Sequence, residues 1–480
     1  MKRKRDILTR QIKKWKARLN VDGSKMKQNI HYDKTYAPVA SWMSVRTLLT
    51  LSAINNWHTR QIDYVLAFPQ APVEKELYMA IPSGIDVSEG DKKDYALKLH
   101  RNVYGQKQAG RVWYNYLRDK LIHKVGFTPS KYDDCVFYKG KTMYILYTDD
   151  PILAGPDKKE INKILQDIQK AGLNVTDEGD LKDFLGINIK RQEDGSILLQ
   201  QPHLIDQILQ SVALHDNKVK EKTTPAMSSK ILRRHLDLPD FDQAFDYASV
   251  IGKLNYLERG TRPDIAYAVH QCARFSTNPK KEHGDAIRHL VKYLKGTKDK
   301  GLILRPNDSL GLEVYVDADF AGNWHKDEWQ DRDTACSRHG YMVLYKGCML
   351  SWKSQLQTEI TLSTTESEYT GLSHALREVI PLMNLMNEMV SLGFVEAKVT
   401  PKMQCKVFED NSGALEIAKE HKYRPRTKHL NIKLHHFRDY VDRGEITINK
   451  IDTCDQLTVY LTKPLERETL ERLRKRSMGW

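Results

Sequence analysis

The stretch Tyr147-Thr148-Asp149-Asp150 decides how the rest of the chain is interpreted. It follows the apolar run 143–146 and precedes the run 151–155, and both runs are rich in aromatic, β-branched or long aliphatic residues. Such runs are typical of short strands, so the two aspartates are predicted to lie at the turn of a hairpin. Burying either carboxylate without a partner costs on the order of several kcal/mol. A divalent cation would remove this cost, whereas solvated charges in an ordinary turn would need no ion.

Length and composition describe a globular chain with an excess of positive charge. The 480 residues are enough for about three domains, each with a core of its own. Charged residues make up 29% of the chain and hydrophobic residues 40%, as in ordinary soluble proteins. The formal net charge of +14 favours a polyanionic partner such as nucleic acid.

The cysteines and the lack of long apolar segments indicate in which cellular compartment the protein is expected. The six cysteines are scattered singly, at Cys135, Cys272, Cys336, Cys348, Cys405 and Cys454. Without a CxxC pair they indicate neither a zinc site nor a disulfide framework. No uncharged apolar stretch of about 18 residues and no signal-peptide segment is present. We therefore expect an intracellular, soluble protein in a cytoplasmic particle or the nucleus, with no membrane partner; the oligomeric state stays open.

Basic residues dominate the beginning of the chain. Between residues 2 and 18, Asp6 is the only acid, and a run of this kind is usually a solvated face or a flexible arm. Trp15 and Leu19 can anchor the end of the run. Lys16 and Arg18 would then reach outward, where phosphates suit them as partners.

Two further stretches place polar groups in an apolar setting. Residues 61–68 are predicted to form a buried strand that is interrupted by Asp63, a carboxylate that needs a partner. The stretch 103–114 is basic, aromatic and bounded by glycine, and it opens onto a helix expected to run through about Lys120. Such a mixture can cradle a base and its phosphates.

These motifs together resemble a known family. Asp63 in a strand, YGQKQAGRVWY at 104–114 and YTDD at 147–150 resemble the polymerase motifs of reverse transcriptases from copia-type long-terminal-repeat retrotransposons. The similarity extends in order and spacing to other stretches along nearly the whole chain, which are 16–19, 31–39, 185–187, 261–266 and 293–297.

The resemblance implies an RNA-directed DNA polymerase that uses two Mg²⁺ or Mn²⁺ ions about 3.5–4 Å apart. It places the ion ligands on Asp63, Asp149 and Asp150. The residues that it implies for nucleotide binding are Lys16, Arg18, Phe68, Gly105 and Gln108. The two basic residues would neutralise the triphosphate, and Gly105 and Gln108 would line the templating base pair. Phe68 would exclude the ribose 2′ hydroxyl, with simple core packing as the alternative.

Acidic residues recur in the C-terminal part. A strand predicted over 313–319 carries Asp317, a helix that begins after Ser363 or Thr364 carries Glu366 and Glu368, and a strand at 405–409 leads into Asp410. With the strands predicted at 340–345 and 349–352, this order resembles an RNase H fold. The resemblance implies a second two-metal site formed by Asp317, Glu368 and Asp410. We prefer Glu368 to Glu366 because it heads a helical run, although acids at a helix start also complement the helix dipole.

Three residues depart from the family pattern. Thr148 replaces an apolar residue, and Pro151 removes a backbone donor directly after the aspartate pair. Val459 occupies the position where the nuclease usually has a fourth carboxylate, and Asp455, one helical turn earlier, is the alternative ligand. We therefore expect the nuclease to be more impaired than the polymerase. With the chain opening at the fingers, the departures also indicate a partial, decaying element copy.

The predicted fold class is α+β, a right-hand polymerase of fingers and palm with a helical connection and a C-terminal RNase H-like domain. The expected domains are fingers and palm at 1–214, linker and helical thumb or connection at 215–309, RNase H-like domain at 310–465, and basic tail at 466–480. The expected function is DNA synthesis on an RNA or DNA template-primer from dNTPs. The alternative is a catalytically dead nucleic-acid-binding remnant of such an element, which Pro151 and Val459 favour.

Overall fold

The computed structural model describes residues 2–5, 12–16, 19–87, 90–216, 218–227, 231–234, 238–396, 402–419 and 436–480, and for 2–5 and 12–16 it describes the backbone alone. The chain forms two compact units. One unit comprises residues 1–45 and 55–181, and the other comprises residues 46–54 and 182–480. Helix α1 (Trp42–Ile54) contributes residues to both.

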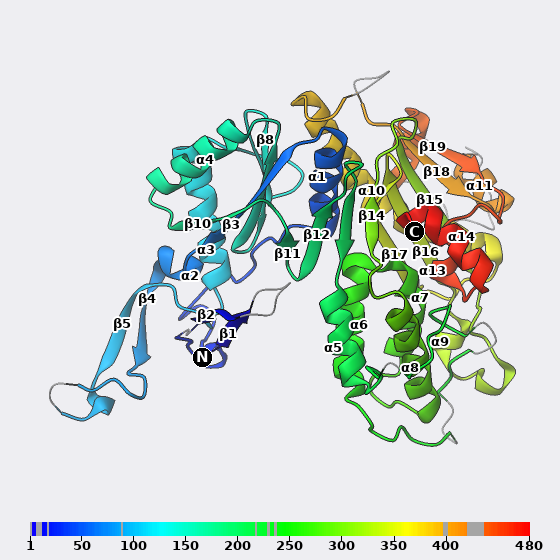
Figure 1. Ribbon diagram of the computed structural model, residues 1–480, viewed down its shortest axis with the longest axis horizontal. Helices are drawn as coiled ribbons and strands as arrows, with labels where there is room; N and C mark the ends of the chain where they lie inside the picture. The colour runs from blue at the N-terminus through cyan, green and yellow to red at the C-terminus, as the bar shows by residue number, and fades with distance from the viewer. Residues whose placement is uncertain are drawn as a thin grey trace. The chain divides into compact units, whose positions relative to one another are not determined.

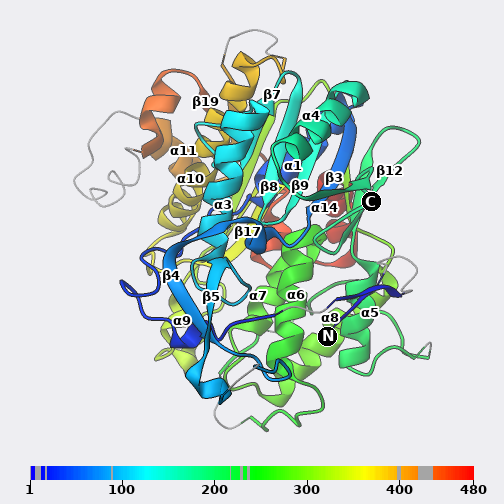
Figure 2. The same cartoon turned by 90° about the vertical axis from the view of Figure 1, so that its left-hand side faces the viewer.

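A six-stranded antiparallel sheet forms the centre of the first unit. Its strands in spatial order are β10 (Val175–Gly179), β3 (His58–Tyr64), β9 (Asp150–Gly155), β8 (Thr142–Tyr147), β7 (Val136–Lys139) and β6 (Thr128–Pro129). Helices α3 (Ala109–Lys120) and α4 (Lys158–Lys170) lie on one face of this sheet (Figures 1 and 2). Strands β8 and β9 pair as far as Tyr147↔Asp150, so the predicted hairpin is confirmed.

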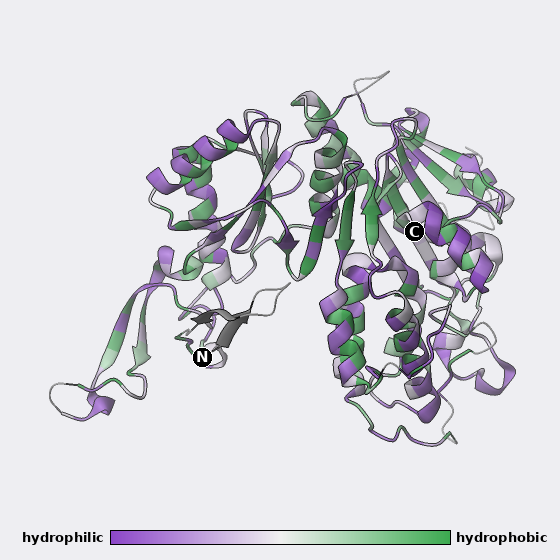
Figure 3. Ribbon diagram, viewed as in Figure 1, coloured by the Kyte–Doolittle hydropathy of each residue, from purple (hydrophilic) through white to green (hydrophobic). Residues whose placement is uncertain are grey.

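Helix α4 shows how local sequence forms these elements. The Asp157 side chain caps its first turn by accepting a hydrogen bond from the Lys159 N–H (2.7 Å). Its apolar residues recur at helical spacing and are buried, at Ile161, Ile164, Leu165 and Ile168. Hydrophobic and hydrophilic bands accordingly alternate along α4 in Figure 3.

The strand predicted over 61–68 ends earlier than expected. Strand β3 stops at Tyr64, because Leu66 adopts a left-handed backbone conformation (φ 53°) that a strand cannot continue through. Phe68 lies in the short helix α2 (Ala67–Gln70). Strands β4 (Pro72–Ala80) and β5 (Ala96–Arg101) then form a separate ribbon that extends away from the six-stranded sheet (Figure 1). The remaining elements of this unit are β1 (Lys2–Arg5), β2 (Ile12–Lys16), η1 (Gly23–Lys25), η2 (Lys92–Asp94) and η3 (Leu121–Val125).

The second unit begins with a small sheet and a group of helices. The sheet joins β11 (Asp183–Phe184), β12 (Ile187–Arg191), β13 (Ile197–Gln200) and β14 (Leu302–Leu304). The helices are α5 (Pro202–Ser211), α6 (Tyr247–Thr261), η4 (Pro263–Ile265), α7 (Ala266–Ala273) and α8 (Lys281–Gly296). The described part of 215–246 forms no helix or strand, as a linker would, but Leu232, Phe241 and Phe245 pack into the core of these helices.

A five-stranded mixed sheet forms the C-terminal part of the second unit. Its order is β17 (Cys348–Leu356), β16 (Arg338–Tyr345), β15 (Leu312–Asp319), β18 (Cys405–Glu409) and β19 (Ile446–Lys450). The first three strands are antiparallel, whereas β15, β18 and β19 run parallel. Helix α10 (Thr364–Ser391) packs closely on one face, since a Cβ at Gly371 would lie 3.4 Å from Val316 Cγ1. The predicted order of strands and helix is confirmed.

Short helices complete the second unit, and its end differs from the prediction. These helices are η5 (Lys326–Glu328), α9 (Arg332–Ala335), α11 (Ser412–Lys419), α13 (Val459–Thr462) and α14 (Arg467–Met478). The stretch predicted as a basic tail at 466–480 contains α14, whose Leu470 and Leu473 are buried and whose Arg474 donates to the Tyr293 hydroxyl (2.7 Å). Alternating apolar and basic residues allow this helix to pack and remain charged outside.

The compact units do not divide where the predicted polymerase domain ends. They separate after residue 181 rather than 214, because β12 and β13 share a sheet with β14. The functional division into four domains stays a prediction. Among the described residues, no helix is long and apolar enough to cross a membrane.

Candidate metal and nucleotide sites

The hairpin between β8 and β9 is braced from the neighbouring helix. Thr148 has a left-handed backbone conformation (φ 55°), and its carbonyl oxygen accepts a hydrogen bond from Trp113 Nε1 in α3 (2.9 Å). The same indole packs edge-on against Tyr64 at the end of β3, with ring centroids 5.2 Å apart. One buried side chain thereby ties the turn, β3 and α3 together, which fixes where Asp149 and Asp150 lie.

The strand register brings Asp63 next to this turn. Strands β3 and β9 pair from His58↔Gly155 to Gln61↔Ile152, and two further steps of the same register set Asp63 opposite Asp150. The Tyr64 N–H still donates to the Asp149 carbonyl oxygen (3.3 Å), so the two backbones remain adjacent there. Side chains of directly opposite residues leave a sheet on the same face. Asp63 and Asp150 therefore face the same side.

The three aspartates do not form a tight ligand cluster. Of the residues that the structure describes, one group of at least three His, Cys, Asp or Glu side chains brings its ligand atoms within 4.8 Å of one another, and it lies in the second unit. A metal site formed by Asp63, Asp149 and Asp150 stays a prediction. Pro151 has no N–H to offer Ile62, and the regular β3–β9 pairing ends at its neighbour Ile152.

Two of the five predicted nucleotide-binding residues cannot be placed as side chains. Lys16 ends strand β2, of which the backbone alone is described, and Arg18 lies outside the described residues. Phe68 is half-buried and packs against Tyr104, with ring centroids 5.0 Å apart. Its packing role is therefore observed, whereas its contact with a nucleotide stays a prediction.

Gly105 and Gln108 lie at the start of α3. Gly105 has a φ of 93°, and a Cβ there would lie 2.1 Å from the Val21 carbonyl oxygen. The close approach of the two backbones thus requires glycine whether or not a base is bound. Gln108 is buried, and its Oε1 accepts no hydrogen bond from the described residues.

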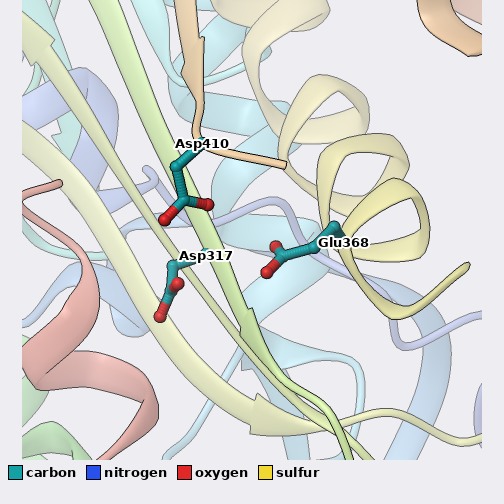
Figure 4. A group of neighbouring side chains, drawn as sticks. All are labelled: Asp317, Glu368 and Asp410. Carbon is teal, nitrogen blue, oxygen red and sulfur yellow. The ribbon is translucent and has the colours of Figure 1, made fainter. Parts of the chain in front are cut away.

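Asp317, Glu368 and Asp410 form a compact carboxylate cluster (Figure 4). One ligand oxygen from each residue lies within 4.8 Å of the others. Asp317 comes from β15, Glu368 from the first turns of α10, and Asp410 from the residue directly after β18. The parallel pairing of β15 with β18 brings the two aspartates to the same end of the sheet. The structure therefore brings together the three residues predicted for the nuclease.

The two candidate glutamates at the start of α10 have different roles. The Ser363 side chain accepts a hydrogen bond from the Glu366 N–H (3.1 Å), and Glu366 Oε2 accepts one from the Leu362 N–H (2.8 Å). Glu366 thus serves the helix start in the manner of a capping box. Glu368 is the glutamate that joins the cluster, in agreement with the preference stated from the sequence.

The cluster is electrostatically suited to a hard cation. Burial raises the pKa of Asp317 to about 6, opposed by a hydrogen bond from the Thr462 hydroxyl. Burial and the neighbouring carboxylates raise the pKa of Glu368 well above its usual range. Its Oε2 is buried and accepts no hydrogen bond from the described residues. Ionising these buried carboxylates in the absence of a cation is costly, and a bound Mg²⁺ or Mn²⁺ ion would offset that cost. Both ions prefer oxygen ligands of this kind.

Comparison with known sequences identifies the family. A profile described as "Reverse transcriptase (RNA-dependent DNA polymerase)" matches residues 1–228. The putative transposon Ty5-1 protein of Saccharomyces cerevisiae is 30% identical over 324 residues, which cover 66% of this chain and 100% of that protein. The chain belongs to the reverse transcriptases of copia-type retrotransposons.

Other relatives extend well beyond the region that matches this chain. The Retrovirus-related Pol polyproteins from transposons TNT 1-94 of Nicotiana tabacum and RE1 of Arabidopsis thaliana are both 32% identical, over 95% and 96% of the chain. The chain spans 34% and 30% of their lengths. A foamy viral protease-reverse transcriptase in complex with double-stranded DNA is 14% identical, with a TM-score of 0.45 over 82% of this chain and 57% of that one.

The position at which the family resemblance predicts a fourth carboxylate borders the cluster. Val459 is buried (5% exposed) in α13, one helical turn before Thr462, whose hydroxyl contacts Asp317. Valine offers no ligand atom there. Asp455 pairs with Arg476 in α14 (2.6 Å) and is not part of the cluster, so the alternative ligand is engaged elsewhere.

Glu409 is a further buried carboxylate that was not predicted from the sequence. Glu409 ends β18, is 0% exposed, and accepts a hydrogen bond from the Asn411 N–H (3.0 Å). Burial raises its pKa to about 8, with further contributions from Asp410 and Asp317. The signal in the sequence was strand alternation: Cys405 and Val407 precede Glu409 at every second position, so its side chain points inward with theirs.

Proposed function

We propose that this chain is an RNA-directed DNA polymerase that also copies DNA, with an attached RNase H-like domain whose activity is impaired. The observation that supports the polymerase best is the register that sets Asp63 opposite Asp150, beside a hairpin turn braced by Trp113. Three carboxylates at one end of neighbouring strands provide the hard oxygen ligands that Mg²⁺ and Mn²⁺ prefer.

Different residues of the first unit have different roles in nucleotidyl transfer. Asp63, Asp149 and Asp150 would hold two divalent cations, which would supply activation of the primer 3′ hydroxyl and binding of the triphosphate. Lys16 and Arg18 neutralise the triphosphate charge. Gly105 and Gln108 line the templating base pair, and Phe68 excludes nucleotides that carry a ribose 2′ hydroxyl.

The carboxylate cluster of the second unit performs hybrid cleavage by the same chemistry. Asp317, Glu368 and Asp410 would hold two cations, which would supply the chemistry for attack on the phosphodiester of an RNA–DNA hybrid. Because Val459 supplies no ligand, transition-state stabilisation falls by a few kcal/mol, or roughly 10²–10³ in rate. Cleavage is therefore nearly absent. Pro151 perturbs only the backbone beside polymerase ligands that are all present, so polymerisation is slow but detectable.

Primer extension tests the polymerase directly. The purified chain is incubated with a primed homopolymer RNA template, dNTPs, and Mg²⁺ or Mn²⁺. We expect extension by the unmodified chain and a loss of at least about 10³-fold in the Asp149→Asn/Asp150→Asn variant. Asp119→Asn, which removes an exposed aspartate from α3, is the matched control and should extend normally. Undiminished extension by the double variant would refute the assignment of the site.

The second candidate function is that of a catalytically dead nucleic-acid-binding remnant. Pro151 and Val459 favour it, since each removes a group that the family pattern provides. Such a remnant would bind primer–template tightly at low salt yet extend no primer with either metal. The same experiment, accompanied by a binding measurement, distinguishes the two candidates.

A further inference from the structure

The carboxylate of Glu409 has no role in the chemistry proposed above. Strand alternation puts it on the same face of the sheet as Val407, and the pairing of β18 with β15 puts Val407 on the face of Val316. This face is covered by α10, because Val316 approaches Gly371 of that helix. Glu409 therefore lies between the sheet and the helix that carries Glu368.

Glu409 and Glu368 are two buried carboxylates without full compensation. Glu409 Oε1 is held by the Asn411 N–H, but Glu409 Oε2 and Glu368 Oε2 are both buried and accept no hydrogen bond from the described residues. Burial and the carboxylates of Glu409, Asp317 and Asp410 all raise the pKa of Glu368. Two such oxygens inside a protein are costly unless a cation or a proton compensates them.

Glu409 also supplies a negative charge that a carboxylate at position 459 would have provided. Asp317, Glu368 and Asp410 carry three negative charges when ionised, and Glu409 adds a fourth. Four carboxylates balance the charge of two divalent cations. Residues behind the direct ligands commonly change metal affinity about 10- to 100-fold when they are removed.

We propose that Glu409 is a positioning residue of the nuclease metal site, which acts through Glu368 and supplies the fourth negative charge in place of the residue missing at Val459. This inference rests on the proposed nuclease function of the cluster. The residual hybrid cleavage of this chain then depends on Glu409.

Manganese binding measured by titration calorimetry tests the inference without relying on activity. All proteins carry Asp149→Asn/Asp150→Asn, so that the palm does not contribute. We expect Glu409→Gln, which keeps size and the oxygen facing Asn411, to weaken Mn²⁺ binding at least about tenfold. Glu409→Asp, which keeps the charge, should retain much of the affinity. Glu313→Gln removes a buried glutamate from β15 of the same sheet and should bind as the parent does.

Hybrid cleavage as a function of Mn²⁺ concentration provides the second readout. Glu409→Gln should need about tenfold more Mn²⁺ for half-maximal cleavage, a shift that a merely structural role would not produce in a variant that melts like its parent. Should circular dichroism show that Glu409→Gln is unfolded, Glu409→Asn replaces it under the same criteria.

Asp410→Asn separates failure of this inference from failure of the proposed function. If Mn²⁺ binding survives Asp410→Asn, the cluster is not the metal site and the proposed nuclease function is wrong. If Asp410→Asn abolishes binding while Glu409→Gln leaves the affinity and the Mn²⁺ dependence of cleavage unchanged, the role of Glu409 is overturned and the nuclease site stands.

Discussion

Position 459 lies beside the carboxylate cluster of the proposed nuclease. Val459 lies on the short helix that also carries Thr462, and Thr462 contacts Asp317. Residues three apart on a helix share a face, so a carboxylate at 459 would point toward the cluster. The carboxylates of Asp317, Glu368 and Asp410 already converge there.

We expect Val459→Asp to raise hybrid cleavage by roughly 10- to 10³-fold and to leave primer extension unchanged. Both activities are measured on one labelled RNA–DNA hybrid, before and after the substitution. Val459→Asn, which has the same size but no charge, is the control and should restore little cleavage. Efficient cleavage by the unmodified chain would instead show that another carboxylate compensates for the valine.

Glu258 provides a pH-sensitive group in the second unit. It lies in α6 and accepts a hydrogen bond from Trp352 Nε1 (2.8 Å). The Arg46 guanidinium stacks on the same indole at 4.0 Å and donates to the carbonyl oxygens of Leu350 and Gly260 (2.9 and 3.0 Å). Burial raises the pKa of Glu258 to about 7, although the Trp352 hydrogen bond, Arg259 and Arg46 oppose the rise.

Folding therefore favours the protonated form of Glu258, and its contribution to stability is lost as the pH rises from 4.5 through about 7. A rise of this size corresponds to about 3 kcal/mol. The free energy of unfolding is measured in urea at pH 5 and at pH 8. Between these two pH values it should fall by about 2–3 kcal/mol more in the unmodified chain than in Glu258→Gln, which keeps the acceptor for Trp352. Parallel pH profiles of the two proteins would contradict the assignment.

At the scale of elements, the pairing of β3 with β9 determines how firmly the aspartates are held. The regular pairing stops at Gln61↔Ile152, before the register reaches Asp63 and Asp150. Pro151 lies at that point and has no N–H for the neighbouring strand. Pro129 in β6 differs from Pro151 in its position, because β6 is an edge strand with a neighbouring strand on one side only.

We expect Pro151→Val to speed primer extension several-fold, because the restored N–H extends the ladder toward Asp63. The added hydrogen bond contributes about 0.5–1.5 kcal/mol to the free energy of unfolding. Replacing proline also raises the conformational entropy of the unfolded chain, which offsets much of this gain. The informative measurement is therefore the extension rate at saturating dNTP rather than the melting temperature. Pro129→Val, the matched edge-strand change, should leave extension unaltered, and an equal response of both variants would rule out the explanation.

At the scale of the whole molecule, net charge determines the response to salt. The formal charge of +14 means that basic side chains are available to displace the cations condensed on a nucleic acid. We expect the affinity for primer–template to fall at least about tenfold between 50 and 200 mM salt in a fluorescence anisotropy titration. A duplex with an uncharged methylphosphonate backbone is the control and should show little salt dependence. Binding that ignores salt, or no binding, would refute the nucleic-acid function.

Local sequence determined the elements and the residue types of the candidate sites. The β8–β9 hairpin, the buried stripe of α4 and the acids on β15, α10 and after β18 were all readable from periodicity and turn chemistry. These features depend on neighbours within a few residues, and hydrophobic burial enforces such patterns in any compact fold.

Tertiary structure alone decided which polar groups meet. The packing of α10 on the sheet brings Glu368 to Asp317 and Asp410, while Arg476 engages Asp455. Glu409 became a candidate when β18 was placed beside β15 and beneath α10. These outcomes depend on strand register and on partners many residues apart, and the electrostatic cost of a buried carboxylate depends on which charges and donors surround it. A single sequence specifies each carboxylate, but long-range packing determines its neighbours.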